Sequence, residues 1–268
     1  MPVSMDALAD DLAAESAVLR GLLAGLDERG WKRDTPAAGW TIVDQVSHLA
    51  YFDDVAVRSA VEPEAFRVEL ARLEAAGGVD PDAIADEHRA LSGSALLAWF
   101  DGARERLITA FRPLDPSMRV PWFGPAMSAA SSLTARIMET WAHGQDVADA
   151  LGVVREPSSR LRHVAHIGVG ARAFSYAVNG RRMPDAAVRV ELDAAGGELW
   201  TWGPPDAPDR VSGTALDFCL AVTQRRHRDD LALAVTGPHA QEWMEIAQAF
   251  AGTPGTGRAS GQFGGDRA

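Results

Sequence analysis

The spacing of the apolar residues changes along the chain, and this change limits the folds that it can adopt. Up to residue 152 the apolar residues recur at three- and four-residue intervals, as on one face of a helix. After about residue 185 they alternate with polar residues, as in a strand that buries one side. The sequence therefore predicts a helical first part and a second part that mixes helices with strands.

Four long helices and one shorter helix are expected before residue 152. Thr41, with Asp44 three residues later, is typical of a capping box at a helix start, and Gly152 is a suitable C-cap for the last helix. A four-helix bundle is the simplest way to bury the apolar stripes. The long helices are predicted at 4–26, 39–60, 92–111 and 128–152, the shorter one at 63–76, and an aromatic, proline-rich loop at 112–127.

The second part has the pattern of a smaller α/β domain. A Gly-Gly turn inside 187–203 indicates a hairpin, and the remaining predicted elements are a helix at 158–180, a strand, turn and helix at 210–224, a strand at 231–237 and a helix at 239–250. The predicted domain boundaries are 1–155 for the bundle and 156–252 for the α/β domain. A glycine-rich tail at 253–268 is expected to be disordered.

The composition excludes several classes of protein. A formal net charge of -11 over 268 residues argues against a general nucleic-acid binder, which needs clustered Lys and Arg. One cysteine, Cys219, rules out an internal disulfide, and its apolar neighbours favour a buried packing role over a nucleophile. The sequence shows neither a secretory signal nor an apolar run that could span a membrane, so a cytoplasmic protein is expected.

Glu139 and His143 are the first candidates for chemistry. Residues four apart in a helix lie on one face, with β-carbons about 5–6 Å apart. A carboxylate and an imidazole are both ligands for zinc and similar ions. The spacing itself is common, and an ordinary solvated helix face is the alternative interpretation.

His48 is the third candidate, at the edge of an apolar stripe in the helix predicted at 39–60. A partly buried core histidine with a backbone partner is the alternative. Asp44, four residues earlier, is either a further ligand or an acceptor for the imidazole N–H. If the helices that carry His48 and His143 are neighbours, two imidazoles and one carboxylate would converge and leave a fourth zinc position open, as in catalytic sites.

These segments resemble a known family. WTIVDQVSHL, followed about 90 residues later by ETWAHGQDVADALG, is similar to the DinB/YfiT-like metal-binding bundles. More narrowly, it resembles the N-terminal domain of the mycothiol-dependent maleylpyruvate isomerase family of actinobacteria. The resemblance implies that His48, Glu139 and His143 bind a divalent metal, usually taken as zinc, with nickel as the other candidate.

The resemblance continues into the second part of the chain, where it implies a sterol-carrier-like α/β domain. SGTALDFCLAVTQRR matches the family's corresponding stretch, except that Gln224 stands where the family commonly has glycine before an arginine. Arg225 fits the position of the arginine that is thought to serve the reaction or the thiol cofactor. Alternatively, the extra charges of Arg226, His227 and Arg228 form a basic helix end that the helix dipole favours.

The resemblance and the candidate site together predict a mycothiol-dependent isomerase or S-transferase. A metal-activated thiolate would attack a small electrophile, while Arg225 or Arg226 holds an anionic group. The alternatives are a metal-dependent hydrolase and a non-catalytic metal- or ligand-binding protein. The expected partners are a small electrophile and a low-molecular-weight thiol, without nucleic acid or membrane, and the expected assembly is a monomer or a homodimer.

Overall fold

The chain forms two compact units. A computed structural model describes residues 4–75 and 77–263, and its contacts divide the chain into Met1–Val154 and Arg155–Ala268. The first unit is mainly helical and the second combines helices with a small sheet. Among the described residues, no helix has both the length and the apolar character that crossing a bilayer requires.

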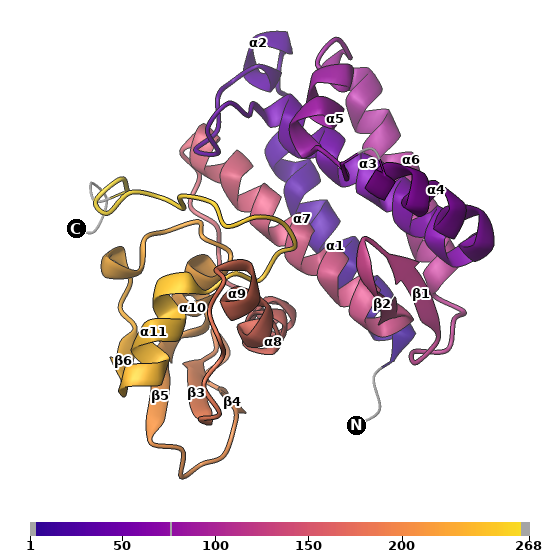
Figure 1. Cartoon of the computed structure of the whole chain (residues 1–268). Coiled ribbons are helices and arrows are strands. Elements are labelled where there is room, and N and C mark those ends of the chain that lie inside the picture. The colour runs from indigo at the N-terminus through magenta and orange to yellow at the C-terminus, as the bar shows by residue number, and fades with distance from the viewer. Residues whose placement is uncertain (1–3, 76, 264–268) are drawn as a thin grey trace. The chain divides into compact units, whose positions relative to one another are not determined.

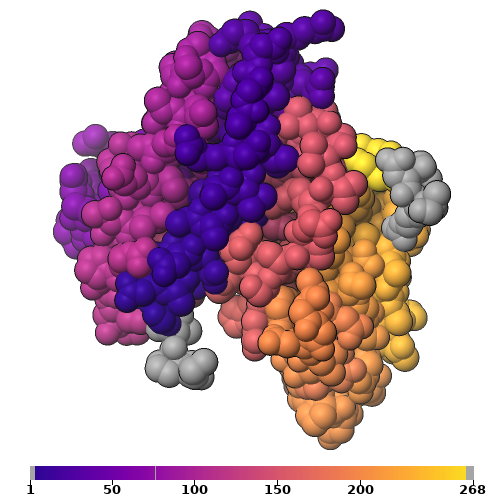
Figure 2. Space-filling model, turned by 180° about the vertical axis from the view of Figure 1, so that it is seen from behind, coloured from indigo at the N-terminus to yellow at the C-terminus, as the bar shows by residue number. Residues whose placement is uncertain are grey.

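Four long helices of the first unit pack against one another, and we call them the bundle (Figure 1). From behind, α1 lies between α6 and α7, both of which it contacts (Figure 2). The bundle helices are α1 (Met5–Leu23), α3 (Ile42–Val61), α6 (Gly93–Phe111) and α7 (Ala129–Leu151). The shorter helices are α2 (Glu28–Trp31), α4 (Pro63–Ala75) and α5 (Pro81–His88). The last residue of the helix predicted at 63–76 lies outside the described residues.

The segment predicted as an irregular loop, 112–127, is largely a β-hairpin. Its strands are β1 (Arg119–Trp122) and β2 (Gly124–Ser128), which pair antiparallel. The prediction of a loop relied on four prolines, but a two-stranded ribbon has only edge strands, which tolerate proline. Two short helices, α2 and α5, were also not predicted, because each has too few turns to show a period in the sequence.

The bundle's core is divided into two apolar clusters. One gathers residues from the C-terminal part of α1 and the N-terminal parts of α3 and α6, including Leu23, Ile42 and Leu96. The other gathers residues from the opposite ends of these helices, including Leu8 and Leu107. On each bundle helix, buried polar residues occupy the positions between the two clusters.

These residues form a buried polar layer, which consists of Glu15 and Ser16 on α1, Asp53 on α3, Arg104 on α6, and Arg136 and Thr140 on α7. Asp53 is its centre: Arg104 Nε donates to one carboxylate oxygen at 2.7 Å and Arg136 Nε to the other at 2.9 Å. Arg104 also donates to the Thr140 hydroxyl at 3.0 Å. Two acidic and two basic residues thus compensate one another inside an apolar core.

Arg136 also links α7 to the backbone of α3. Its Nη2 donates to the Leu49 carbonyl oxygen at 3.2 Å, next to His48 in the sequence. The same guanidinium pairs with Asp53. Two contacts about one helical turn apart on α3 therefore fix how far α7 can slide along it.

The second unit contains a four-stranded sheet in the order β4-β3-β5-β6. β3 pairs antiparallel with β4, as the predicted hairpin requires, and parallel with β5, which pairs antiparallel with β6. Alternate side chains of β3 are buried. The strands are β3 (Val188–Asp193), β4 (Leu199–Trp202), β5 (Asp209–Thr214) and β6 (Ala234–Thr236).

The helices of this unit pack on the sheet and on one another. They are α8 (Leu161–Gly170), α9 (Arg172–Val178), α10 (Ala215–Val222) and α11 (Pro238–Ile246), with a 3-10 turn at Arg228–Asp230. α8 and α10 pack so closely that a β-carbon on Gly168 would lie 2.6 Å from a Val222 methyl carbon. The single helix predicted at 158–180 is broken at Ala171, just after two glycines of low helix propensity.

One other detail of the second unit differs from the predictions. The turn expected between strand and helix in 210–224 is absent, because β5 runs directly into α10 and the Thr214 hydroxyl caps the helix by accepting from Asp217 N. The structure describes 253–263 of the tail expected to be disordered, and Asp230 accepts a hydrogen bond there from Gly261 N. The rest of that tail, 264–268, lies outside the described residues.

The polar layer predicts an unequal effect of two aspartate substitutions. Asp53→Ala would leave two buried guanidinium groups without their shared carboxylate, and should lower the free energy of unfolding by about 3–5 kcal/mol. Asp10→Ala removes a surface partner of Arg112. The Asp10 side chain is 70% exposed, so its loss should lower the free energy of unfolding by less than about 1 kcal/mol. Urea denaturation of both variants would measure the difference, and equal costs would contradict a structural role for the layer.

Candidate metal centre

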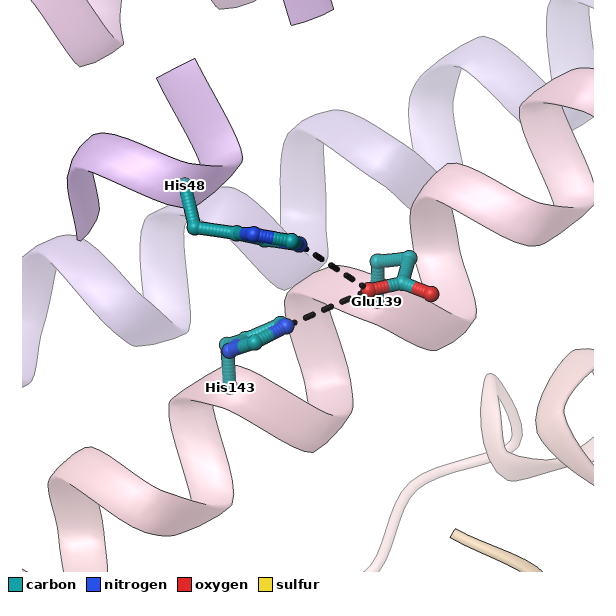
Figure 3. A group of neighbouring side chains, drawn as sticks. All are labelled: His48, Glu139 and His143. Atoms are coloured by element: carbon teal, nitrogen blue, oxygen red, sulfur yellow. Dashed lines mark hydrogen bonds and ion pairs between the residues drawn. The ribbon is translucent and has the colours of Figure 1, made fainter. Parts of the chain in front are cut away.

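His48, Glu139 and His143 converge on one point in the first unit (Figure 3). Glu139 Oε2 lies 3.2 Å from His143 Nε2 and 3.6 Å from His48 Nε2. The two imidazole rings have their centroids 4.4 Å apart. The three side chains retain exposures of 14%, 20% and 11%, so the group is recessed but can be reached from solvent.

The separations suit a shared metal ion. At Zn–N and Zn–O distances of roughly 2.0–2.1 Å, tetrahedral ligands lie about 3.3 Å from each other. The two nitrogen–oxygen separations, 3.2 Å and 3.6 Å, lie on either side of this value. Three protein ligands would leave one tetrahedral position open, as in catalytic zinc sites. All three donor atoms lie within 4.8 Å of one another, so the donor set and its spacing are compatible with one shared divalent ion.

The helices present the three residues for identifiable reasons. Glu139 and His143 are one turn apart on α7, which Ser128 caps at its start and Gly152 ends in a left-handed conformation, as predicted. His48 lies on α3, whose capping box pairs Thr41 with Asp44. The buried polar layer lies beside these residues and fixes the position of α7 along α3.

Asp44, expected as a further ligand or as the acceptor for His48, has neither role. One of its oxygens accepts from the Thr41 backbone N and hydroxyl at 2.7 and 2.8 Å, and the other accepts from Arg89 Nε at 2.8 Å. The helix cap and the ion pair with Arg89 together engage both carboxylate oxygens. His48 Nδ1 is buried and has no hydrogen-bond partner among the described residues.

Aromatic rings surround the two imidazoles. Trp40 lies 5.5 Å from the His48 ring and is stacked at 6.0 Å on that of His143, while Phe52 lies 4.6 Å from His48. Trp40 Nε1 donates to Asp82 on α5 at 2.7 Å. Trp40 was not among the predicted site residues. Its position directly before the helix cap at Thr41 is the one sequence feature that could have indicated it.

The electrostatics of the group suit metal ligands. Burial and the neighbouring His143 lower the pKa of His48 from 6.5 to about 4, so its imidazole is neutral at pH 7. Burial alone would raise the pKa of Glu139, but hydrogen bonds from His143 and His48 outweigh this and hold it well below 4.5. Metals bind the neutral imidazole and the ionised carboxylate, which are the forms present here.

The other predicted site residues lie in the second unit, after α10. Gln224, which replaces the family's glycine, has a φ of 58°, the left-handed conformation that glycine favours. A glycine at this position would adopt this conformation without strain. Arg225 follows it and donates to the Thr223 carbonyl oxygen at 2.7 Å, and Arg226 lies over the Phe263 ring at 3.6 Å.

Cys219, on the same helix, is fully buried, as the sequence predicted. Its Sγ lies 3.4 Å from the Leu161 carbonyl oxygen. Burial raises the pKa of its thiol, which keeps the sulfur protonated and unreactive at neutral pH. The chain therefore has no thiol nucleophile of its own.

The depressed pKa of His48 predicts a pH dependence of stability in the metal-free protein. Between pH 6.5 and about 4 the unfolded chain binds a proton at His48 that the folded chain does not, so acidification through this window lowers the free energy of unfolding. The loss at His48 should be on the order of 3 kcal/mol. His48→Gln, which cannot titrate, should lose less stability than the wild type when chelator-treated samples are unfolded in urea at both ends of the window. Equal losses would contradict the neutral state of His48.

The fold resembles that of solved structures. Two crystal structures of mycothiol-dependent maleylpyruvate isomerase, one of them of a mutant, superpose with TM-scores of 0.58 and 0.57. They are 18% and 17% identical to this chain, and each alignment covers 88% of this chain and 96% of the other. At this identity, the likeness shows a common fold.

Sequence comparisons find nearer relatives. Proteins from two strains of Mycobacterium tuberculosis, both described as uncharacterized, are 49% identical over 251 residues, which is 92% of this chain and 96% of theirs. A family model for wyosine base formation matches 184–236. The model of the mycothiol maleylpyruvate isomerase N-terminal domain matches 12–148, just over half of the chain and the part that carries the three converging side chains. The chain therefore belongs to the mycothiol maleylpyruvate isomerase N-terminal domain family.

Proposed function

We propose that this protein is a metal-dependent enzyme that uses a low-molecular-weight thiol, mycothiol, to isomerise or modify a small electrophile. The observation that carries the proposal is the convergence of His48, Glu139 and His143 at separations that suit one metal ion. Membership of a mycothiol-dependent family supports the choice of thiol. In this proposal the bundle is DinB-like and the second unit is sterol-carrier-like.

His48, Glu139 and His143 would hold zinc, and nickel suits the same donor set. A bound zinc would lower the pKa of a coordinated thiol, which supplies a thiolate at neutral pH. The neutral state of His48 and the ionised state of Glu139 mean that neither has to lose a proton before it binds metal. The recessed position of the three side chains reduces competition from bulk water.

The nucleophilic sulfur would come from outside the chain, because Cys219 is buried and protonated. The thiolate would add to an activated carbon–carbon double bond of the electrophile: the carbon–sulfur bond would form as the π pair shifts onto the conjugated carbonyl, which leaves a carbon–carbon single bond that can rotate. Return of the electron pair would expel the thiolate and give isomerisation, whereas protonation of the resulting enolate would keep the sulfur on the product and give S-transfer. A reducing cytoplasm, where such a thiol stays reduced, is the location that we propose.

Arg225 and Arg226 are proposed to hold an anionic group of the thiol or the substrate. The left-handed backbone at Gln224 supports the assignment of Arg225 to the family's arginine position. Arg225 would act as a charged anchor, and Arg226 is its alternative. The working assembly would be a monomer or a homodimer with small molecules as its only partners.

Metal content tests the centre directly. Wild-type protein purified without chelator should contain close to one zinc or nickel per chain by elemental analysis, and His48→Ala should contain little, because two ligands do not retain the ion. His166→Ala is the matched control, since His166 is an exposed histidine of the second unit and should leave the metal content unchanged. Equal metal in wild type and His48→Ala would remove His48 from the centre.

Turnover with and without thiol tests the reaction class. With maleylpyruvate and related electrophiles, the wild type should be active only when mycothiol is added, and His143→Ala should lose at least about 100-fold in kcat/KM, because the ligand set is broken. Turnover that persists without thiol would instead identify a metal-dependent hydrolase. Stoichiometric metal without turnover under either condition would identify a binding protein.

A further inference from the structure

Gln45 connects the proposed metal centre to the loop before α3. Its side chain is fully buried, one turn before His48 on the same helix. Its Oε1 lies 2.5 Å from His143 Nδ1, on the side of the imidazole away from Glu139. Its Nε2 lies 2.9 Å from the Thr35 hydroxyl oxygen. Both ends of the amide are therefore in use.

The direction of these hydrogen bonds follows from Thr35. The Thr35 hydroxyl lies 2.8 Å from the Trp40 carbonyl oxygen, which can only accept. The single hydroxyl proton is therefore donated to Trp40, and the hydroxyl oxygen accepts from the NH2 group of Gln45. This requirement turns the amide oxygen of Gln45 towards His143.

The proton of His143 is fixed in turn. An amide oxygen only accepts, so the hydrogen bond to Gln45 requires a proton on His143 Nδ1. With a proton on Nδ1, Nε2 is the only ring nitrogen through which the imidazole can bind a metal. Nε2 lies 3.2 Å from Glu139, the neighbouring candidate ligand. We propose that Gln45 is a positioning residue that holds a proton on His143 Nδ1 and so leaves Nε2 as the nitrogen that binds the metal.

The inference deepens the proposed function and rests on it for the identity of the ligand, a divalent metal. The effect is specific to one imidazole, since His48 Nδ1 has no hydrogen-bond partner among the described residues. Partners of this kind, which orient a ligating histidine, typically contribute 10–100-fold to metal affinity. Gln45 should therefore affect metal binding without touching the metal.

The test compares two substitutions of Gln45. Gln45→Met keeps the length of the side chain but has no oxygen to accept the Nδ1 proton, and should weaken zinc binding by about 10–100-fold in a chelator competition. Gln45→Glu keeps an acceptor and should stay within a few-fold of the wild type. Gln145→Met is the control, because Gln145 is also buried but bonds to Asp149 on its own helix.

The tautomer itself is measured by ¹⁵N NMR of the histidine rings in the metal-free protein, a readout that a general loss of packing would not move. Wild type and Gln45→Glu should show a proton on His143 Nδ1, and Gln45→Met should show this proton partly or wholly lost. If Gln45→Met does not fold, Thr35→Val breaks the same chain of hydrogen bonds at its other, half-buried end and should shift the His143 proton in the same direction.

The two proposals fail in different ways. A wild type that binds no zinc would overturn the metal centre, while the tautomer in the metal-free protein would still report on Gln45. Unchanged zinc affinity and an unchanged tautomer in Gln45→Met would overturn the positioning role and leave the metal centre intact. A wild type whose His143 Nδ1 carries no proton would overturn it as well.

Discussion

The ion pairs of Asp53 determine how the helices of the first unit align. One buried carboxylate binds Arg104 of α6 through one oxygen and Arg136 of α7 through the other. Sliding either helix by one turn would leave charges unpaired in an apolar core, which costs several kcal/mol. His48 stands five residues before Asp53, and Glu139 three after Arg136, so the same ion pair brings the two ligands level.

Most of the features that could be predicted were predicted from local sequence patterns. Apolar residues at three- and four-residue intervals identified the bundle helices. The capping box at Thr41 and the glycine at 152 identified helix ends that the structure confirms. The spacing of Glu139 and His143 placed them on one face. His48 was a candidate from its place at the edge of an apolar stripe. Its convergence with Glu139 and His143 depended on the resemblance to a family, because no local pattern indicates which helices become neighbours.

Other features depend on contacts that the sequence does not encode locally. Gln45 bonds to a residue 98 positions away, and a polar residue on a buried face has no partner that periodicity can identify. Asp44 shows the opposite error: it was a candidate ligand by its distance from His48, yet the cap of its own helix uses it. Short hairpins such as β1–β2 carry too few residues for a clear pattern.

The proposed metal centre would link ion capture to the folding of the first unit, because its ligands are far apart along the chain. His48 and Glu139 are separated by 90 residues, which include α4, α5, α6 and the hairpin β1–β2. No single hairpin of helices presents the complete donor set, so an unfolded or half-folded chain has little affinity for the ion. A free metal concentration of 100 times the dissociation constant would add about 2.7 kcal/mol to the free energy of unfolding by mass action alone. The loaded protein would then resist proteolysis at sites far from the ion, and metal supply would influence how much of it persists in the cell.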